Sequence, residues 1–226
     1  MYFSRISLSP YADTQQVARQ VCRDAYREHQ FLWRLFEEDP DAERDFLFRR
    51  DTQVTRPRFY LLSDRRPLRN GDIWQTETKP FEPNLQAGQR LAFSLRANPV
   101  VTRRDGEGRQ VRHDVVMDLK QRMGYKKLSP TERPLLSDLV QQAGVNWLQR
   151  RADKHGFSFV PEAVRVDGYD RQRSLKKGSK QAIRYSTLDF TGLLTVEDAV
   201  CFQQALMRGI GPAKAFGCGL LLVRRV

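Results

Sequence analysis

Cysteines, histidines and long apolar segments are scarce in this sequence. Its three cysteines lie far apart and form no C-x-x-C pair, which argues against a disulfide framework and is typical of a cytoplasmic protein. Three equally scattered histidines argue against a structural zinc site, and we expect no metal and no other cofactor. No apolar run approaches the roughly 18 residues of a membrane-spanning helix, and no charged segment followed by an apolar one opens the chain. We therefore expect neither a signal peptide nor a membrane partner.

Positive charge, by contrast, is abundant. The 226 residues contain 39 Lys and Arg against 27 Asp and Glu, which gives a formal net charge of +12. Such an excess is typical of proteins that bind nucleic-acid phosphates. Hydrophobic residues make up 40% of the chain, enough for a folded core, and the length suits two domains of about 100 residues each.

Hydrophobic periodicity and turn residues predict the elements of the first half. We expect a strand over residues 1–10, a helix over 14–36, and strands over 44–50, 58–63 and 73–79. A strand, a helix and then further strands is the order of a split βαβ unit, the ferredoxin-like or RRM-like fold.

The sequence pattern of the second half predicts a similar unit. We expect strands over 91–103 and 111–119, a helix over 131–154, a long hairpin over 163–196, a helix over 197–207 and a final strand after a glycine-rich loop. The capping-box-like segment S-P-T-E opens the first of these helices. The expected fold is therefore α+β: two tandem ferredoxin-like domains with antiparallel sheets, over residues 1–85 and 86–226.

The glycine-rich loop is a candidate phosphate site. Gly209, Gly211, Gly217 and Gly219 allow left-handed backbone and close approach of another chain, and Lys214 adds a charge among exposed amides. The alternative is a compact helix-to-strand turn that closes a domain core. The loop matches neither a P-loop nor a dinucleotide-binding fingerprint.

Several segments together resemble one protein family. They are GIGPAKAFGCGLL (209–221), YREHQFLWRLF (26–36), PDAERDFLF (40–48) and LRANP (95–99). These segments resemble the CasE-class (Cse-type) repeat-processing endoribonucleases, CRISPR-associated members of the RAMP superfamily. The resemblance implies two ferredoxin-like domains and cleavage of the stem-loop repeat of CRISPR precursor RNA at the 3′ side of the stem. It also implies retention of the product with the other subunits of the Cascade surveillance complex.

Two residues of the first helix are the candidate catalytic groups. Metal-independent RNA cleavage uses the 2′-hydroxyl as nucleophile and needs a general base and a general acid, which a histidine can provide near neutral pH. His29 lies on this helix with Tyr26 three residues earlier, and the resemblance assigns a catalytic role to both positions. Taken without the resemblance, His29 fits an ordinary surface histidine and Tyr26 a core aromatic residue.

Basic residues gather in two further places that we expect to contact RNA. Arg23 and Arg27 flank Tyr26, and the alternative for both is a solvated helix face. The tip of the long hairpin carries cations without an acid, and a thin basic ribbon can follow the groove of an A-form stem, although a solvated loop is the alternative. The expected RNA-binding residues of this hairpin are Arg171, Arg173, Lys176, Lys177, Lys180 and Arg184. From the glycine-rich loop they are Gly209, Gly211, Lys214 and Gly217.

Two other functions compete with the endoribonuclease. A non-catalytic RRM-like scaffold subunit of a ribonucleoprotein needs the same basic surface but no catalytic histidine. A DNA-binding protein is less favoured because the sequence shows neither helix-turn-helix nor zinc-finger spacing.

Overall fold

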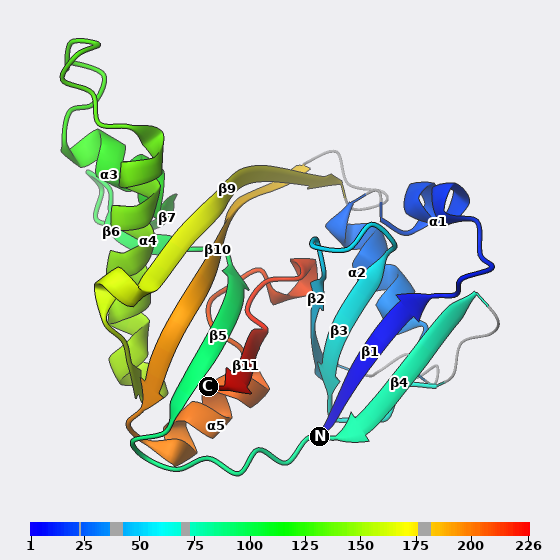
Figure 1. The fold of residues 1–226 in the computed structure, drawn as a ribbon. Coiled ribbons are helices and arrows are strands. Elements are labelled where there is room, and N and C mark those ends of the chain that lie inside the picture. Colours follow the sequence, from blue (N-terminus) through cyan, green and yellow to red (C-terminus); the bar gives the residue numbers. More distant parts are fainter. Residues whose placement is uncertain (23, 37–42, 69–72, 176–181) are drawn as a thin grey trace.

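The computed structural model describes residues 1–22, 24–36, 43–68, 73–175 and 182–226. Two antiparallel sheets lie side by side, one built from each half of the chain (Figure 1). No helix in the described ranges is both long and apolar enough to cross a membrane.

The first half forms a four-stranded sheet in the order β2-β3-β1-β4. Its elements are β1 (Tyr2–Leu8), α1 (Thr14–Gln20), α2 (Ala25–Trp33), β2 (Phe46–Arg50), β3 (Arg58–Ser63) and β4 (Trp74–Pro80). Helices α1 and α2 lie on one face of the sheet (Figure 1). Alternating residues of β1, β2 and β3 bury Ile6, Phe48 and Phe59 under Leu32 of α2. This strand order is that of a ferredoxin-like fold, as predicted.

The second half repeats that order as β11-β5-β10, with β9 pairing along the outer edge of β10 and the short β8 continuing that edge. Its strands are β5 (Arg90–Ala97), β6 (Val100–Arg104), β7 (Gln110–Asp114), β8 (Phe157–Ser158), β9 (Val164–Leu175), β10 (Ala182–Val196) and β11 (Leu221–Arg225). Its helices are α3 (Val115–Arg122), α4 (Leu136–Ala152), α5 (Ala199–Arg208) and the 3-10 turns η1 (Asp153–His155), η2 (Pro161–Ala163) and η3 (Lys214–Phe216). The β6–β7 ribbon is an addition to the ferredoxin-like plan.

Four predicted elements are wrong in their extent. The helix expected over 14–36 is two helices, because the Asp24 side chain accepts the amides of Tyr26 and Arg27 and starts α2 afresh. The strand expected over 91–103 is two strands, β5 and β6, which belong to different sheets. The strand expected over 111–119 ends at Asp114, whose carboxylate caps α3 by accepting the amide of Met117.

The helix expected over 131–154 begins later than predicted. The side chains of Ser129 and Glu132 do bond to each other, and Glu132 accepts the Ser129 amide. They close a separate turn, however, and α4 starts only at Leu136, beyond Pro134. The segment therefore makes the hydrogen bonds of a capping box, but no helix follows it directly.

Apolar and charged contacts join the two halves. Leu47 and Leu62 of the first sheet form a buried cluster with Leu220, which precedes β11. Beside them Asp189 of β10 accepts two hydrogen bonds from Arg96 and lies 3.6 Å from Arg49 of β2. The glycine-rich loop runs between the halves, where η3 packs against α2 and β2.

Candidate active site between the two halves

Helix α2 places His29 at the boundary between the halves. The Asp24 cap fixes the start of the helix, and Phe31 and Leu32 bury its inner face. The His29 ring is half-buried and lies 5.5 Å from Phe46 and 5.8 Å from Trp33, measured between ring centroids. These aromatic neighbours hold the imidazole in place and shield one side of it from water.

The His29 ring is electrostatically unusual. Its Nδ1 atom is buried and has no hydrogen-bond partner among the described residues. Burial lowers the pKa of His29, and the positive charge of Arg44 lowers it further. The neutral imidazole is thus the favoured form near pH 7, with one ring nitrogen available to accept a proton.

The glycine-rich loop brings Lys214 to the same place. Ala213, just before it, has a φ of 59°, the one left-handed residue other than glycine in the described chain. The Lys214 side chain is half-buried, and its pKa is lowered by burial and by the charges of Arg44 and Arg208. His29 and Lys214, from opposite ends of the sequence, therefore both lie within electrostatic reach of Arg44.

The loop glycines are packed against protein groups. A Cβ atom on Gly209 would meet Leu47 at 2.9 Å, one on Gly211 the ring of Trp147 at 3.2 Å, and one on Gly217 the ring of Phe48 at 3.2 Å. All three have positive φ values. The compact turn that was the alternative interpretation of this loop accounts for these three residues, and their contact with RNA stays a prediction.

The remaining predicted residues of the first half lie near the start of α2. Tyr26 is half-buried in its first turn, whereas Arg27 lies 4.0 Å from the Asp24 carboxylate with its side chain 48% exposed. Arg23 lies outside the described residues.

The predicted basic hairpin is present as β9 and β10. Arg173 lies directly opposite Arg184, and Arg171 points to the same face, so three guanidinium groups share one side of the ribbon. Like charges directly across a ladder repel each other, which an anion bound between them would relieve. Lys176, Lys177 and Lys180 lie outside the described residues.

The opposite face of this ribbon meets the glycine-rich loop. Tyr185 lies 5.0 Å from the ring of Phe216, and burial raises the pKa of Tyr185. The hairpin is therefore connected to the candidate site through η3.

Comparison with known proteins decides the family. A family model described as "CRISPR associated protein" matches residues 1–225. The chain belongs to this family of CRISPR-associated proteins. A relative from Escherichia coli K12, the CRISPR system Cascade subunit CasE, is 35% identical over 215 residues, 91% of this chain and 94% of that protein. The CRISPR-associated endoribonuclease Cse3 of Thermus thermophilus is 31% identical over 154 residues, 64% of this chain and 60% of that protein.

Solved structures of the family share the fold. The crystal structure of Cas6e from Escherichia coli K-12 is 28% identical, with a TM-score of 0.65 and full coverage of both chains. A structure of CRISPR endoribonuclease Cse3 bound to a 19-nucleotide RNA is 25% identical, with a TM-score of 0.71 over 99% of this chain and 100% of that chain. The family resemblance and the predicted ferredoxin-like fold are both confirmed.

The sequence pattern does not identify two charged residues of the site, Arg44 and Glu28. Arg44 precedes β2 in an acidic stretch and gives no signal of its own. Glu28, next to His29, is buried against Arg50, whose guanidinium lies 3.1 Å from it. Their importance arises only when β2 packs against α2.

Proposed function

We propose that this protein is a metal-independent endoribonuclease that cleaves the stem-loop repeat of CRISPR precursor RNA at the 3′ side of the stem to give mature guide RNA. The single observation that carries the proposal is the position of His29 at the boundary of the halves, with its buried Nδ1 atom unpartnered among the described residues and the Lys214 turn η3 packed against α2 and β2. The charge of Arg44 acts on both side chains, since it lowers the pKa of His29 and of Lys214. The named activity of the relative Cse3 and its RNA-bound structure support the same substrate class.

The reaction requires no group beyond those of the chain and the RNA. The neutral imidazole of His29 takes the proton of the ribose 2′-hydroxyl, and the new O2′–P bond forms. The P–O5′ bond then breaks, and the leaving oxygen takes up a proton. Tyr26, one turn earlier on α2, orients the phosphate or supplies that proton. The products are a 2′,3′-cyclic phosphate and a 5′-hydroxyl.

RNA binding is assigned to basic residues at this site and on the face of the β9–β10 ribbon that points away from the glycine-rich loop. Arg171, Arg173 and Arg184 lie on one face of the hairpin, with Lys176, Lys177 and Lys180 at its tip by sequence. Arg23 and Arg27 on the α2 side, and Gly209, Gly211, Lys214 and Gly217 in the loop, complete the proposed set. A folded stem held by phosphate contacts accounts for the net charge of +12.

The location, partners and domain limits follow from the same relatives. Since CasE is named as a Cascade subunit, we infer that this chain stays bound to its product and joins the other subunits of a cytoplasmic surveillance complex. The catalytic helix belongs to a domain over residues 1–85 and the basic hairpin and glycine-rich loop to one over 86–226. The end of β4 at Pro80 and the start of β5 at Arg90 support this limit.

The test is cleavage of the hairpin repeat RNA in EDTA by the wild-type protein and by His29→Ala. We expect the wild type to release a 5′-hydroxyl fragment and a cyclic phosphate, and a 2′-deoxy nucleotide at the cut site to abolish the reaction. His29→Ala should lower the cleavage rate at least about 100-fold, because it removes the proton acceptor, and should keep its affinity for the 2′-deoxy hairpin. Cleavage that requires added Mg²⁺ contradicts the mechanism. Equal cleavage by His29→Ala would contradict the assigned site, and hairpin binding without any cleavage favours the scaffold.

A further inference from the structure

Arg44 differs from the other arginines around it. Four arginines of the same half each lie within 4 Å of a carboxylate: Arg49 with Asp189, Arg50 with Glu28, Arg58 with Asp51 and Arg65 with Asp45. Arg44 has no ion pair with any residue that the structure describes. Its NH1 atom is nevertheless buried and without a hydrogen-bond partner among those residues. One nitrogen of this half-buried guanidinium is thus withdrawn from water, with no described anion beside it.

The position of Arg44 follows from strand alternation. Phe46 and Phe48 lie on the face of β2 that meets α2, with ring centroids 5.5 and 6.2 Å from that of His29. Arg44 precedes Phe46 by two residues, so an extended chain directs its side chain to the same face. Its charge reaches both His29 and Lys214, since it lowers the pKa of each.

A cluster of positive groups without carboxylate partners is costly unless an anion binds there. Burial lowers the pKa of Arg44 itself, which is the sign of a poorly solvated charge. Lys214 also has no ion pair within the described ranges. The ammonium of Lys214 and the guanidinium of Arg44 are both hydrogen-bond donors, and the oxygens of a phosphate can accept from both. A guanidinium offers two parallel N–H donors that match two oxygens of one phosphate, whereas an ammonium acts as a point charge.

We propose that Arg44 is a catalytic residue, whose guanidinium together with Lys214 binds the non-bridging oxygens of the phosphate at which His29 acts. This inference rests on the proposed function for its substrate, a phosphodiester of RNA. Attack by the 2′-oxygen places additional negative charge on those oxygens, and donors already in position stabilise that state more than the ground state. Arg44 therefore acts on the rate of cleavage more than on the affinity for the hairpin.

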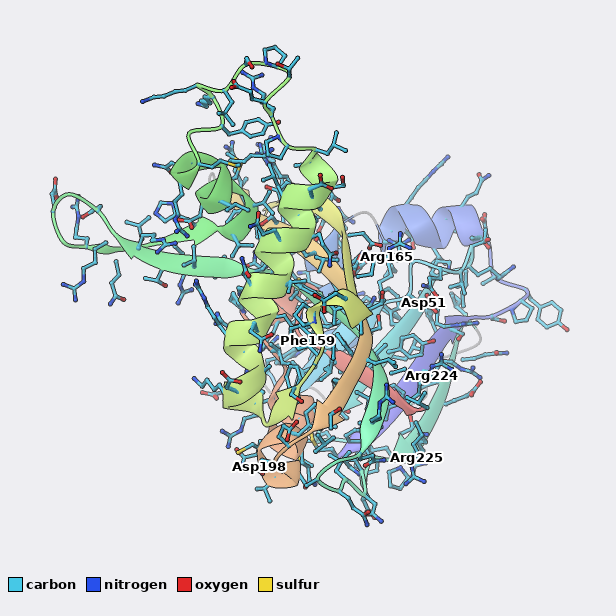
Figure 2. All side chains as sticks on the ribbon, turned by 60° about the vertical axis from the view of Figure 1, so that its left-hand side comes forward. Asp51, Phe159, Arg165, Asp198, Arg224 and Arg225 are labelled. Atoms are coloured by element: carbon cyan, nitrogen blue, oxygen red, sulfur yellow. The ribbon has the colours of Figure 1, made fainter. Side chains whose placement is uncertain are left out.

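The first test asks whether the free protein holds an anion at this place. Inorganic phosphate is titrated into the protein while the His29 ring is followed by NMR. Phosphate bound beside His29 should raise its pKa in the wild type and leave it unchanged in Arg44→Met. The control is Arg165→Met, which changes an exposed arginine (labelled in Figure 2) that pairs with Asp167 near the start of β9, at the other end of the strand from the hairpin tip. An equal response in Arg44→Met and the wild type would overturn the assignment.

The second test measures cleavage. Arg44→Met should lower the single-turnover rate constant at least about 100-fold and change the affinity for the 2′-deoxy hairpin less than about fivefold. Arg44→Lys keeps the charge but loses the two-donor geometry, and its single-turnover rate constant should be about tenfold lower than that of the wild type. Without the charge of Arg44 the His29 pKa rises, so the acidic limb of the pH–rate profile should move to higher pH.

The outcomes separate this inference from the proposed function. If the wild type does not cut the hairpin, the proposed function fails, and the phosphate titration alone then decides whether Arg44 binds an anion. If the wild type cuts and Arg44→Met cuts equally fast, Arg44 is not catalytic. Since Arg44 makes no ion pair in the described chain, its removal should not lower the thermal midpoint. A fall of the midpoint together with the loss of cleavage in both variants would show a structural role and overturn the proposal.

Discussion

Neighbouring residues of α2 face different surroundings, and their proton affinities diverge accordingly. Burial and then the charge of Arg44 lower the pKa of His29, whereas burial raises the pKa of Glu28 to about 7 although Arg50 lies 3.1 Å away. Desolvation therefore outweighs the attraction of one partly exposed guanidinium at Glu28. Both shifts act in the pH range in which the protein is expected to work.

Glu28→Gln should change how stability depends on pH. Because the folded-state pKa is raised, the folded protein holds this proton more tightly than the unfolded chain, and stability falls as pH rises from about 4.5 to about 7. The glutamine variant lacks this loss. We expect the free energy of unfolding of the wild type, relative to Glu28→Gln, to fall by on the order of 3 kcal/mol between pH 4 and pH 8. Urea unfolding at several pH values measures this difference, and a difference that stays constant with pH contradicts the raised pKa.

The sequence identifies catalytic candidates at this scale only when the residue type is rare. His29 was found because histidine is scarce and matches a family motif. Arg44 was not, because it is one of 39 basic residues and only its tertiary neighbours distinguish it. Burial without a partner cannot be seen in a one-dimensional pattern.

At the scale of elements, the residue at which a helix begins fixes the positions of the functional groups that the helix carries. The hydrophobic pattern across residues 14–36 continues through the break between α1 and α2, so periodicity alone predicts one helix. The signal for the break is Asp24, whose side chain satisfies two amides of a new helix. Asp114 acts in the same way before Val115 and Val116, whose β-branched side chains favour a strand prediction.

Asp24→Ala should destabilise α2 and slow cleavage. Loss of a helix cap costs about 1 kcal/mol, and here it loosens the turn that carries Tyr26 and precedes His29. Asp24→Asn keeps the acceptor and should restore both properties. Thermal unfolding and single-turnover cleavage of the hairpin measure the two effects.

The matched control is Asp198→Ala, which removes the same kind of cap from α5 (Figure 2). It should lower the thermal midpoint without slowing cleavage at temperatures well below that midpoint. Equal losses of cleavage in both variants would mean that α2 has no special role in the reaction.

At the scale of the whole molecule, the candidate site exists only while the halves are docked. The order of strands and helices predicts two ferredoxin-like units, because that order restricts the possible topologies. It does not predict how the units meet, since the contacts join residues from opposite ends of the chain. His29 and Arg44 come from the first half, and Lys214 comes from the second.

Asp189 is a charged group that links the halves. Its carboxylate accepts two hydrogen bonds from Arg96, at 2.9 and 2.6 Å, and lies 3.6 Å from Arg49 of the other half. Removing the negative charge leaves two largely buried guanidinium groups close together, which costs on the order of 3 kcal/mol. Asp189→Asn should therefore lower the stability of the second half and also weaken the contact between the two halves.

Calorimetry of Asp189→Asn should then show two separate transitions where the wild type, joined through Leu47, Leu62 and Leu220, shows one. Cleavage should fall in parallel, because η3, which contains Lys214, no longer stays packed against α2. Glu77→Gln is the matched control: Glu77 also accepts two hydrogen bonds from one arginine, but its partner Arg5 lies within the same sheet. That variant should keep a single transition and normal cleavage. A single transition and full activity in Asp189→Asn would show that the halves stay docked without this carboxylate, and that the site does not depend on it.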